Sequence, residues 1–212
     1  MIRILVAKIT TYIFQAAFLL LAGYGLWRDA SDQSGWLGLF GFGLSFMPVI
    51  LRRWRGVTLP PSYCFAYLGY ILLSLVLGEE FYLYNRLWWW DDMLHMLSGV
   101  AIGYVALLLL SIRNIRLNVR SPRWFSLLFM GSVVLASAAL WEMFEFAVDQ
   151  LAGGHMQYGV TDTMMDMINS SIGGLLLTAI VYRQLGRGHG PTRLFRIFYR
   201  DNPQFETVKG GV

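Results

Sequence analysis

Repeated apolar runs, each approaching the roughly 20 residues that a helix needs to cross a bilayer, constrain the fold of this chain most. Only 14% of the 212 residues are charged, whereas a soluble domain carries about 25%. A transmembrane β-barrel would show short segments of alternating polarity instead. The sequence therefore predicts an all-α polytopic membrane protein, a bundle of six transmembrane helices.

The predicted spans make up one domain, residues 1–185, and residues 186–212 follow as a basic cytoplasmic tail with a surface helix expected near 192–200. The expected spans are residues 9–27, 35–51, 60–77, 92–112, 124–149 and 162–182. The second span contains glycines that suit close helix packing, namely Gly35, Gly38, Gly41 and Gly43. The aromatic residues of 78–90 are typical of the membrane–water interface.

Charged residues are segregated between alternate loops. All but Arg28 and Arg86 of the 17 Lys and Arg residues lie at the N-terminus, after the second and fourth spans, or in the tail. The positive-inside rule then places both termini in the cytoplasm of a bacterial inner-membrane, multi-pass protein. This segregation accounts for the net charge of +4 without a nucleic-acid partner. The acids sort the other way, because all 13 except Asp201 and Glu206 fall on the outer side or in outer helix halves.

Acidic residues stand inside three of the predicted spans. Glu142 and Glu145 interrupt the fifth, and carboxylates at membrane depth usually face a polar interior or a ligand. In the fourth, Asp91 and Asp92 precede His95 by four and three residues, so either can share its helix face. The sixth carries one stripe of polar or small residues, namely Asp162, Asp166, Asn169 and Gly173. With the predicted topology, these clusters converge in the outer third of the bundle.

Like charges at such density require protons or cations to neutralise them. The expected metal ligands are Asp91, Asp92, His95, Glu142, Glu145, Asp162 and Asp166. Oxygen donors with one imidazole suit a divalent ion such as Zn²⁺, Mn²⁺, Mg²⁺ or Fe²⁺, and the number of ions stays open. The single cysteine, Cys64, lies in an apolar run, which excludes a thiolate site.

A metal near the membrane surface can polarise a phosphoryl oxygen, which favours a hydrolase or transferase acting on a lipid or lipid-linked phosphate. In such an enzyme Glu145 or Asp149 would act as base, His155 as proton donor, and Arg86 as the phosphate ligand. Two alternatives stay open: a metal used only as a structural clamp, and a cation or proton-coupled transporter. The inner halves of the last three spans are almost wholly apolar, which disfavours a transport pathway.

The acidic motifs resemble those of small bacterial inner-membrane proteins of the YjdF type. Asp91 and His95 match an Asp-x-x-x-His motif of that family. The other matching residues are Glu142, Glu145 and Phe146 in Glu-x-x-Glu-aromatic, and Asp162, Asp166 and Met167 in Asp-x-x-x-Asp-Met. The chain departs from the family at Gly159, where an Asp often stands. The resemblance covers about residues 85–174 and implies a membrane location and an acidic site more than a particular reaction.

Overall fold

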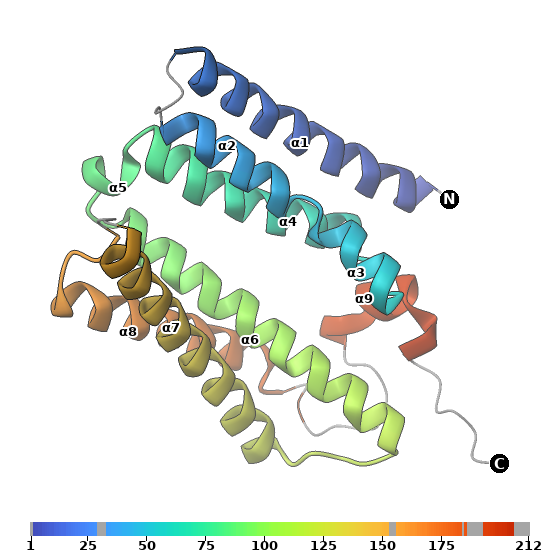
Figure 1. Ribbon diagram of the computed structural model, residues 1–212. Helices are drawn as coiled ribbons and strands as arrows, with labels where there is room; N and C mark the ends of the chain where they lie inside the picture. The colour runs from blue at the N-terminus through green and yellow to red at the C-terminus, as the bar shows by residue number, and fades with distance from the viewer. Residues whose placement is uncertain (1, 29–32, 153–155, 184, 186–192, 206–212) are drawn as a thin grey trace. The chain divides into compact units, whose positions relative to one another are not determined.

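The computed structural model describes residues 2–28, 33–152, 156–183, 185 and 193–205, and all the regular structure in these ranges is helical (Figure 1). In chain order the long helices are α1 (Ile2–Arg28), α2 (Gln33–Leu44), α3 (Met47–Arg55), α4 (Pro61–Ile71), the π-helix η1 (Leu72–Glu80), α6 (Trp90–Leu117), α7 (Arg123–Ala152) and α8 (Val160–Val181). The short ones are α5 (Leu83–Arg86), η2 (Arg193–Phe195), α9 (Arg196–Asp201) and η3 (Pro203–Phe205).

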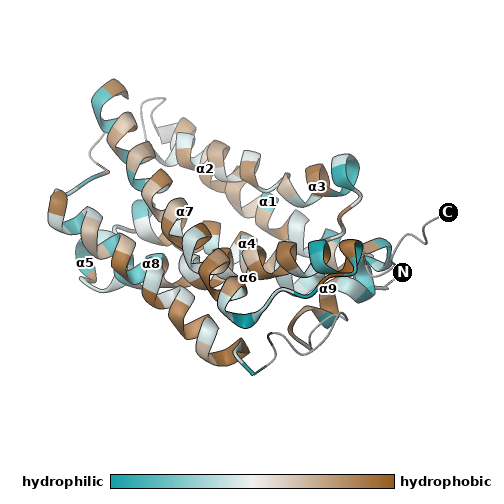
Figure 2. Cartoon of the chain, turned by 90° about the horizontal axis from the view of Figure 1, so that it is seen from below, coloured by the Kyte–Doolittle hydropathy of each residue, from teal (hydrophilic) through white to brown (hydrophobic). Residues whose placement is uncertain are grey.

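Six helical segments are long and apolar enough to cross a membrane: Leu5–Trp27, Ser34–Arg55, Pro61–Glu80, Trp90–Leu117, Arg123–Leu151 and Val160–Val181. This confirms the predicted all-α architecture with six spans. Figure 2 shows why the segments suit a bilayer, because hydrophobic residues run along the long helices, and hydrophilic colour gathers at the end of α3 and at α9.

The chain divides into two compact units, Met1–Trp90 with Arg200–Asn202, and Asp91–Tyr199 with Pro203–Val212. In the first unit, α1 and α2 pack with their backbones almost touching. A Cβ placed on Gly25 would lie 2.2 Å from the Gly35 amide nitrogen, and one placed on Gly38 would lie 2.4 Å from that of Ala22. Small residues allow such close approach between spans, so the predicted role of the second-span glycines is seen at Gly35 and Gly38.

The second and third spans of the first unit are each built from two helical pieces. Proline has no amide hydrogen to donate to the fourth residue before it. Pro48 therefore cannot continue the ladder onto Leu44, and α2 ends at that residue before α3 begins at Met47. In the third span, α4 passes into η1, and Tyr82, with a left-handed φ of 58°, terminates the segment. The aromatic-rich stretch beyond it forms only the single turn α5.

The second unit contains α6, α7 and α8, and α6 and α8 cross at glycines. A Cβ on Gly99 of α6 would lie 1.9 Å from the carbonyl oxygen of Ser170. A Cβ on Gly173 of α8 would lie 2.0 Å from the carbonyl oxygen of Met96. The two backbones are therefore in direct contact over about one turn. This crossing determines which acidic residues of α6 and α8 face each other.

The C-terminal segment packs its aromatic side chains inside the protein. Tyr199 is 1% exposed, and its hydroxyl lies 2.8 Å from that of Ser111 on α6. The hydroxyl of Tyr104, also on α6, donates to the Leu194 carbonyl at 3.1 Å. α9 falls in the range expected for a surface helix, but Phe198 and Tyr199 are buried.

In the first unit, the Asn202 amide makes two 2.7 Å hydrogen bonds with the backbone N–H and carbonyl of Thr58.

Candidate metal centre

The first turns of α6 place Asp91 and His95 on one face. The two residues are one helical turn apart, and His95 Nε2 lies 3.5 Å from Asp91 Oδ1. The His95 side chain is 14% exposed, so the ring lies mostly inside the unit. Acidic residues in a first helical turn are also stabilised by the helix dipole. That effect explains why Asp91 and Asp92 suit this position, but not why His95 turns inward beside Asp91.

The crossing of α6 and α8 brings a second carboxylate to the same imidazole. Asp166 Oδ1 lies 3.7 Å from His95 Nε2, and the Asp166 side chain is 4% exposed. One turn further along α8, the Asn169 amide donates to Asp92 Oδ1. The sequence left open whether Asp91 or Asp92 shares the face of His95. In the structure Asp91 lies near the imidazole, whereas Asp92 accepts the hydrogen bond from Asn169.

α7 contributes two buried glutamates. Glu142 and Glu145 are 5% and 8% exposed. The indole N–H of Trp141, one turn before Glu145, donates to Glu145 Oε1 at 2.7 Å. Thr163 and Gln157 approach the Glu142 carboxylate, but neither completes a hydrogen bond of normal geometry, and both Glu142 oxygens have no partner among the described residues. A buried carboxylate without a partner is costly, so the Glu142 carboxylate needs a proton, a water molecule or a cation to offset its burial.

The carboxylates are close enough to repel one another. The charge of Asp166 interacts with four others, those of Asp91, Asp162, Glu142 and Glu145. Asp162 and Asp92 in turn interact with the His95 ring. All seven predicted ligands therefore belong to one electrostatic cluster within the second unit. Such a cluster needs bound protons or cations, since several unpaired negative charges cannot share a buried site.

Three donor atoms lie close enough together to be candidate ligands of one metal ion. One ligand atom each of Asp91, His95 and Asp166 can be chosen so that all three lie within 4.8 Å of one another. The 3.5 and 3.7 Å separations from His95 exceed ordinary hydrogen-bond lengths. Two ligands about 2.0–2.1 Å from a tetrahedral ion are about 3.3 Å apart. Contraction of each His95–carboxylate separation by a few tenths of an ångström would bring both pairs to this spacing.

The segment between α7 and α8 is tied to the glutamate end of α7. Both carboxylate oxygens of Asp149 accept backbone N–H groups, from Met156 at 2.8 Å and from Gln157 at 2.9 Å. The Gln157 side chain then donates to the Glu142 carbonyl and to the Thr163 hydroxyl. Asp149 therefore shapes the segment through its hydrogen bonds, which makes it a poor candidate for a catalytic base. The sequence carried no signal for the bridge made by Gln157.

Of the three predicted catalytic residues, the structure brings only Glu145 into the acidic cluster. Glu145 lies in the cluster, held by Trp141. The Trp141 contact was missed in the sequence, although its spacing of four residues from Glu145 could have suggested it. His155 lies outside the described residues. Arg86 ends α5 in the first unit and is exposed, and its role in phosphate binding stays a prediction.

Comparisons with known proteins identify a membrane family. The chain is 27% identical over 150 residues to an uncharacterized protein of Thermotoga maritima, an alignment that covers 70% of this chain and 77% of that protein. No solved structure matches the chain. A family model described as "Predicted membrane protein (DUF2238)" matches residues 9–187, which include every residue of the acidic cluster. The expected membership of the YjdF-type proteins is thereby confirmed, and the chain belongs to this predicted membrane protein family.

Proposed function

We propose that the cluster binds a divalent metal through Asp91, His95 and Asp166, with Glu142 as a further ligand. The observation that carries the proposal is the buried Glu142 carboxylate without a hydrogen-bond partner. It interacts electrostatically with Asp166, one of the three residues whose donor atoms already converge. A cation would remove both the repulsion and the unsatisfied oxygens. Carboxylate donors with one imidazole suit Zn²⁺, Mn²⁺, Fe²⁺ or Mg²⁺.

The chemistry we propose for this site is hydrolysis or transfer of a phosphate attached to a lipid. A bound divalent ion supplies a Lewis acid that polarises a phosphoryl oxygen and makes a bound water more acidic. Glu145 would accept a proton from the water that attacks phosphorus and would return it to the lipid oxygen as the bond between phosphorus and that oxygen breaks. Trp141 would orient Glu145 through its indole hydrogen bond. Two of the ligand spans begin within two turns of the cluster, which supports a site near headgroup depth.

The proposed metal site competes with a purely ionic cluster. A protonated His95 lying between Asp91 and Asp166 would also lower the repulsion, without any metal. That arrangement leaves both oxygens of Glu142 without a hydrogen bond, because the imidazole faces the two aspartates. The proposed metal accounts for Glu142 as well, and we therefore favour it.

Elemental analysis of the purified protein, after growth with added metals, tests the site. The wild type should carry a near-stoichiometric divalent metal, and Glu142→Ala and Asp166→Ala should each lose most of it. Glu80→Ala, which changes an acid of η1 in the first unit, is the control and should keep the metal. A wild type without metal would overturn the proposal and favour the ionic cluster.

A second experiment tests the reaction. Metal-loaded protein should release phosphate from a panel of long-chain and polyprenyl phosphates or phospholipids, and Glu145→Gln should reduce the rate at least 100-fold. Protein that binds metal but turns over none of these lipids would leave the metal as a structural clamp. Metal flux into proteoliposomes would instead support transport.

A further inference from the structure

An apolar groove follows α6 and α7 away from the acidic cluster. It has a volume of about 350 Å³, which lies within the range of roughly 300–1,000 Å³ for ligand pockets. Ser137 is the single residue with a polar side chain among those that line it. The groove is therefore suited to hydrocarbon.

The walls of the groove are two stripes with a four-residue repeat. Ala101, Val105 and Leu109 form the stripe on α6, and Phe129, Val133 and Ser137 form the stripe on α7. Residues four apart lie above one another on a helix face, so each wall runs for about 12 Å along its helix. A groove of this form accommodates an extended chain rather than a compact ligand.

Both stripes end near the level of the acidic cluster along their helices. α6 and α7 are consecutive helices that run in opposite directions (Figure 1). Ala101 follows His95 by six residues, about 9 Å of rise, and Ser137 precedes Glu142 by five, about 7.5 Å. Each groove end nearest the cluster is thus less than two turns from a cluster residue. The groove and the cluster lie in the same unit of the protein.

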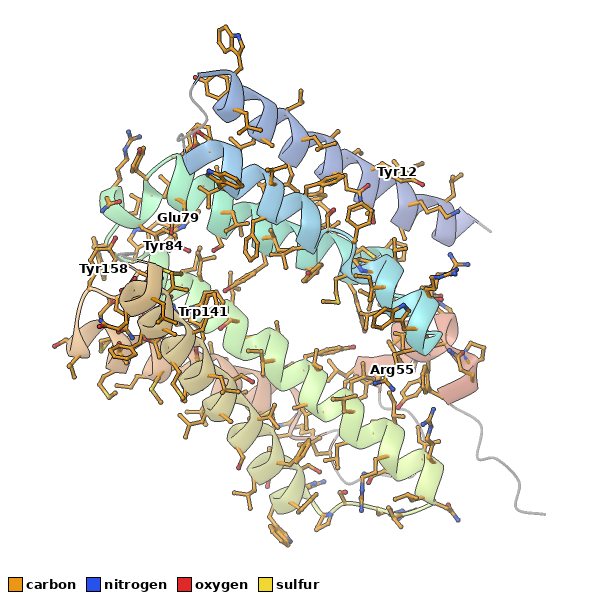
Figure 3. All side chains as sticks on the ribbon, in the orientation of Figure 1. Tyr12, Arg55, Glu79, Tyr84, Trp141 and Tyr158 are labelled. Carbon is orange, nitrogen blue, oxygen red and sulfur yellow. The ribbon has the colours of Figure 1, made fainter. Side chains whose placement is uncertain are left out.

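Trp141 stands where the groove leads into the cluster. It is the next residue after Ser137 in the four-residue repeat of α7, and its indole N–H is bonded to Glu145. Figure 3 shows Trp141 and Tyr158 toward the end of this unit at which α7 leads into α8. A ring with one apolar face and one polar edge suits the junction between a hydrocarbon chain and a polar headgroup.

We propose that the groove binds the hydrocarbon chain of a long-chain phosphate whose headgroup lies at the acidic cluster. The inference rests on the proposed metal site, because a phosphate needs a cation to approach these carboxylates. It narrows the substrate class to phosphates with an extended chain of which at least about 12 Å lies against the protein. Trp141 is then a positioning residue for both chain and headgroup.

Photolabelling tests this assignment. The probe is a dodecylphosphonate that carries a diazirine in its chain and whose carbon–phosphorus bond the proposed reaction does not break. It is added to the full-length, metal-loaded protein in detergent, with dodecanol carrying the same diazirine as the uncharged control. Peptide mass spectrometry should find the phosphonate probe on the α6 and α7 stripes at least fivefold more often than the alcohol. Ser137→Phe should lower this labelling at least fivefold and leave the metal content unchanged. The matched control is Leu135→Phe, at an exposed position of α7 outside the groove. It should change neither the labelling of the stripes nor the metal content.

The outcomes separate this inference from the proposed function. Equal labelling of all lipid-facing helices by both probes would mean annular lipid only, and would overturn the groove assignment even in a protein that retains its metal. Labelling confined to the first-unit helices would overturn it as well. Absence of metal in elemental analysis would refute the proposed site, independently of where the chain binds.

Discussion

A Cβ on Gly99 would lie only 1.9 Å from the carbonyl oxygen of Ser170, so the backbones of α6 and α8 touch at this glycine. Backbone atoms cannot yield as the end of a flexible side chain can. The contact therefore determines the distance between the two helices that carry His95 and Asp166. Residues that bind no ligand thus control the geometry of the acidic cluster.

Gly99→Ala should consequently destabilise the protein and impair the metal site. Forcing a methyl group between two backbones typically costs about 1–3 kcal/mol, and the separation from His95 to Asp166 would increase with the helix spacing. Thermal unfolding in detergent and metal stoichiometry measure the two effects. Gly131→Ala on α7 is the control, since a Cβ there meets no atom within 4 Å. Equal behaviour of the two variants would contradict the close crossing.

The unpaired Glu142 carboxylate predicts a reversal of stability on metal removal. In chelator, Glu142→Leu should be more stable than the wild type by about 1–3 kcal/mol, because it removes an unsatisfied buried polar group. With metal at 1,000 times its dissociation constant, the wild type should gain about 4.1 kcal/mol from binding. The variant should gain much less. The wild type should therefore unfold at a higher temperature than Glu142→Leu with metal, and at a lower temperature than this variant in chelator.

Glu80→Leu provides the comparison for that experiment. Glu80 is in the first unit and only half-buried, so its replacement should shift both unfolding temperatures alike. If Glu142→Leu also shifted the unfolding temperature by the same amount with metal and in chelator, the buried carboxylate would not be a metal ligand.

Trp141→Phe should weaken metal binding without removing it. The variant keeps an aromatic ring and loses the N–H that holds Glu145 at 2.7 Å. Glu145 is not one of the proposed ligands, but its charge interacts with those of Glu142 and Asp166, and loss of a hydrogen bond that orients a group around the ligands lowers metal affinity about 10–100-fold. Competition with a fluorescent chelator measures the change. Trp124→Phe, an exposed position near the start of α7, should leave the affinity unchanged, and an equal loss in that variant would point to a general effect on α7.

Tyr199→Phe should destabilise the second unit by about 0.5–1.5 kcal/mol, the net contribution of one hydrogen bond. The lost bond is the 2.8 Å contact with the Ser111 hydroxyl. Ser111→Ala should cost a similar amount, and the double variant should cost less than the two together, because both remove one interaction. Additive losses in thermal unfolding would show that the hydroxyls act separately. Tyr158→Phe, at an exposed tyrosine, should be neutral.

The six spans could be predicted because a bilayer imposes a length and an apolar composition that are visible in any one segment. The stripe on the last span is equally visible, since four-residue spacing follows from helix geometry alone. In the structure Asp166, Asn169 and Gly173 of this stripe are all buried. These features depend on one helix at a time.

Features that depend on two helices could not be predicted in the same way. The sequence left Asp91 and Asp92 equivalent beside His95. The crossing of α6 and α8 at Gly99 and Ser170 brings Asn169 to Asp92 and Asp166 to His95, and neither contact is visible in a single helix. The basic composition of the tail indicated a surface segment. The burial of Tyr199 against Ser111 depends on a pairing 88 residues apart that no local pattern reveals.

The order of the three cluster helices has a consequence for biosynthesis. Asp91 and His95 are on the fourth span, the glutamates on the fifth and Asp166 on the sixth, so insertion from the N-terminus would place Glu142 and Glu145 in the membrane before the helix that carries Asp166. During that interval a proton on each glutamate would lower the cost of its burial. The complete cluster would form only when the last helix has inserted, and an ion that needs Asp166 would bind after that step.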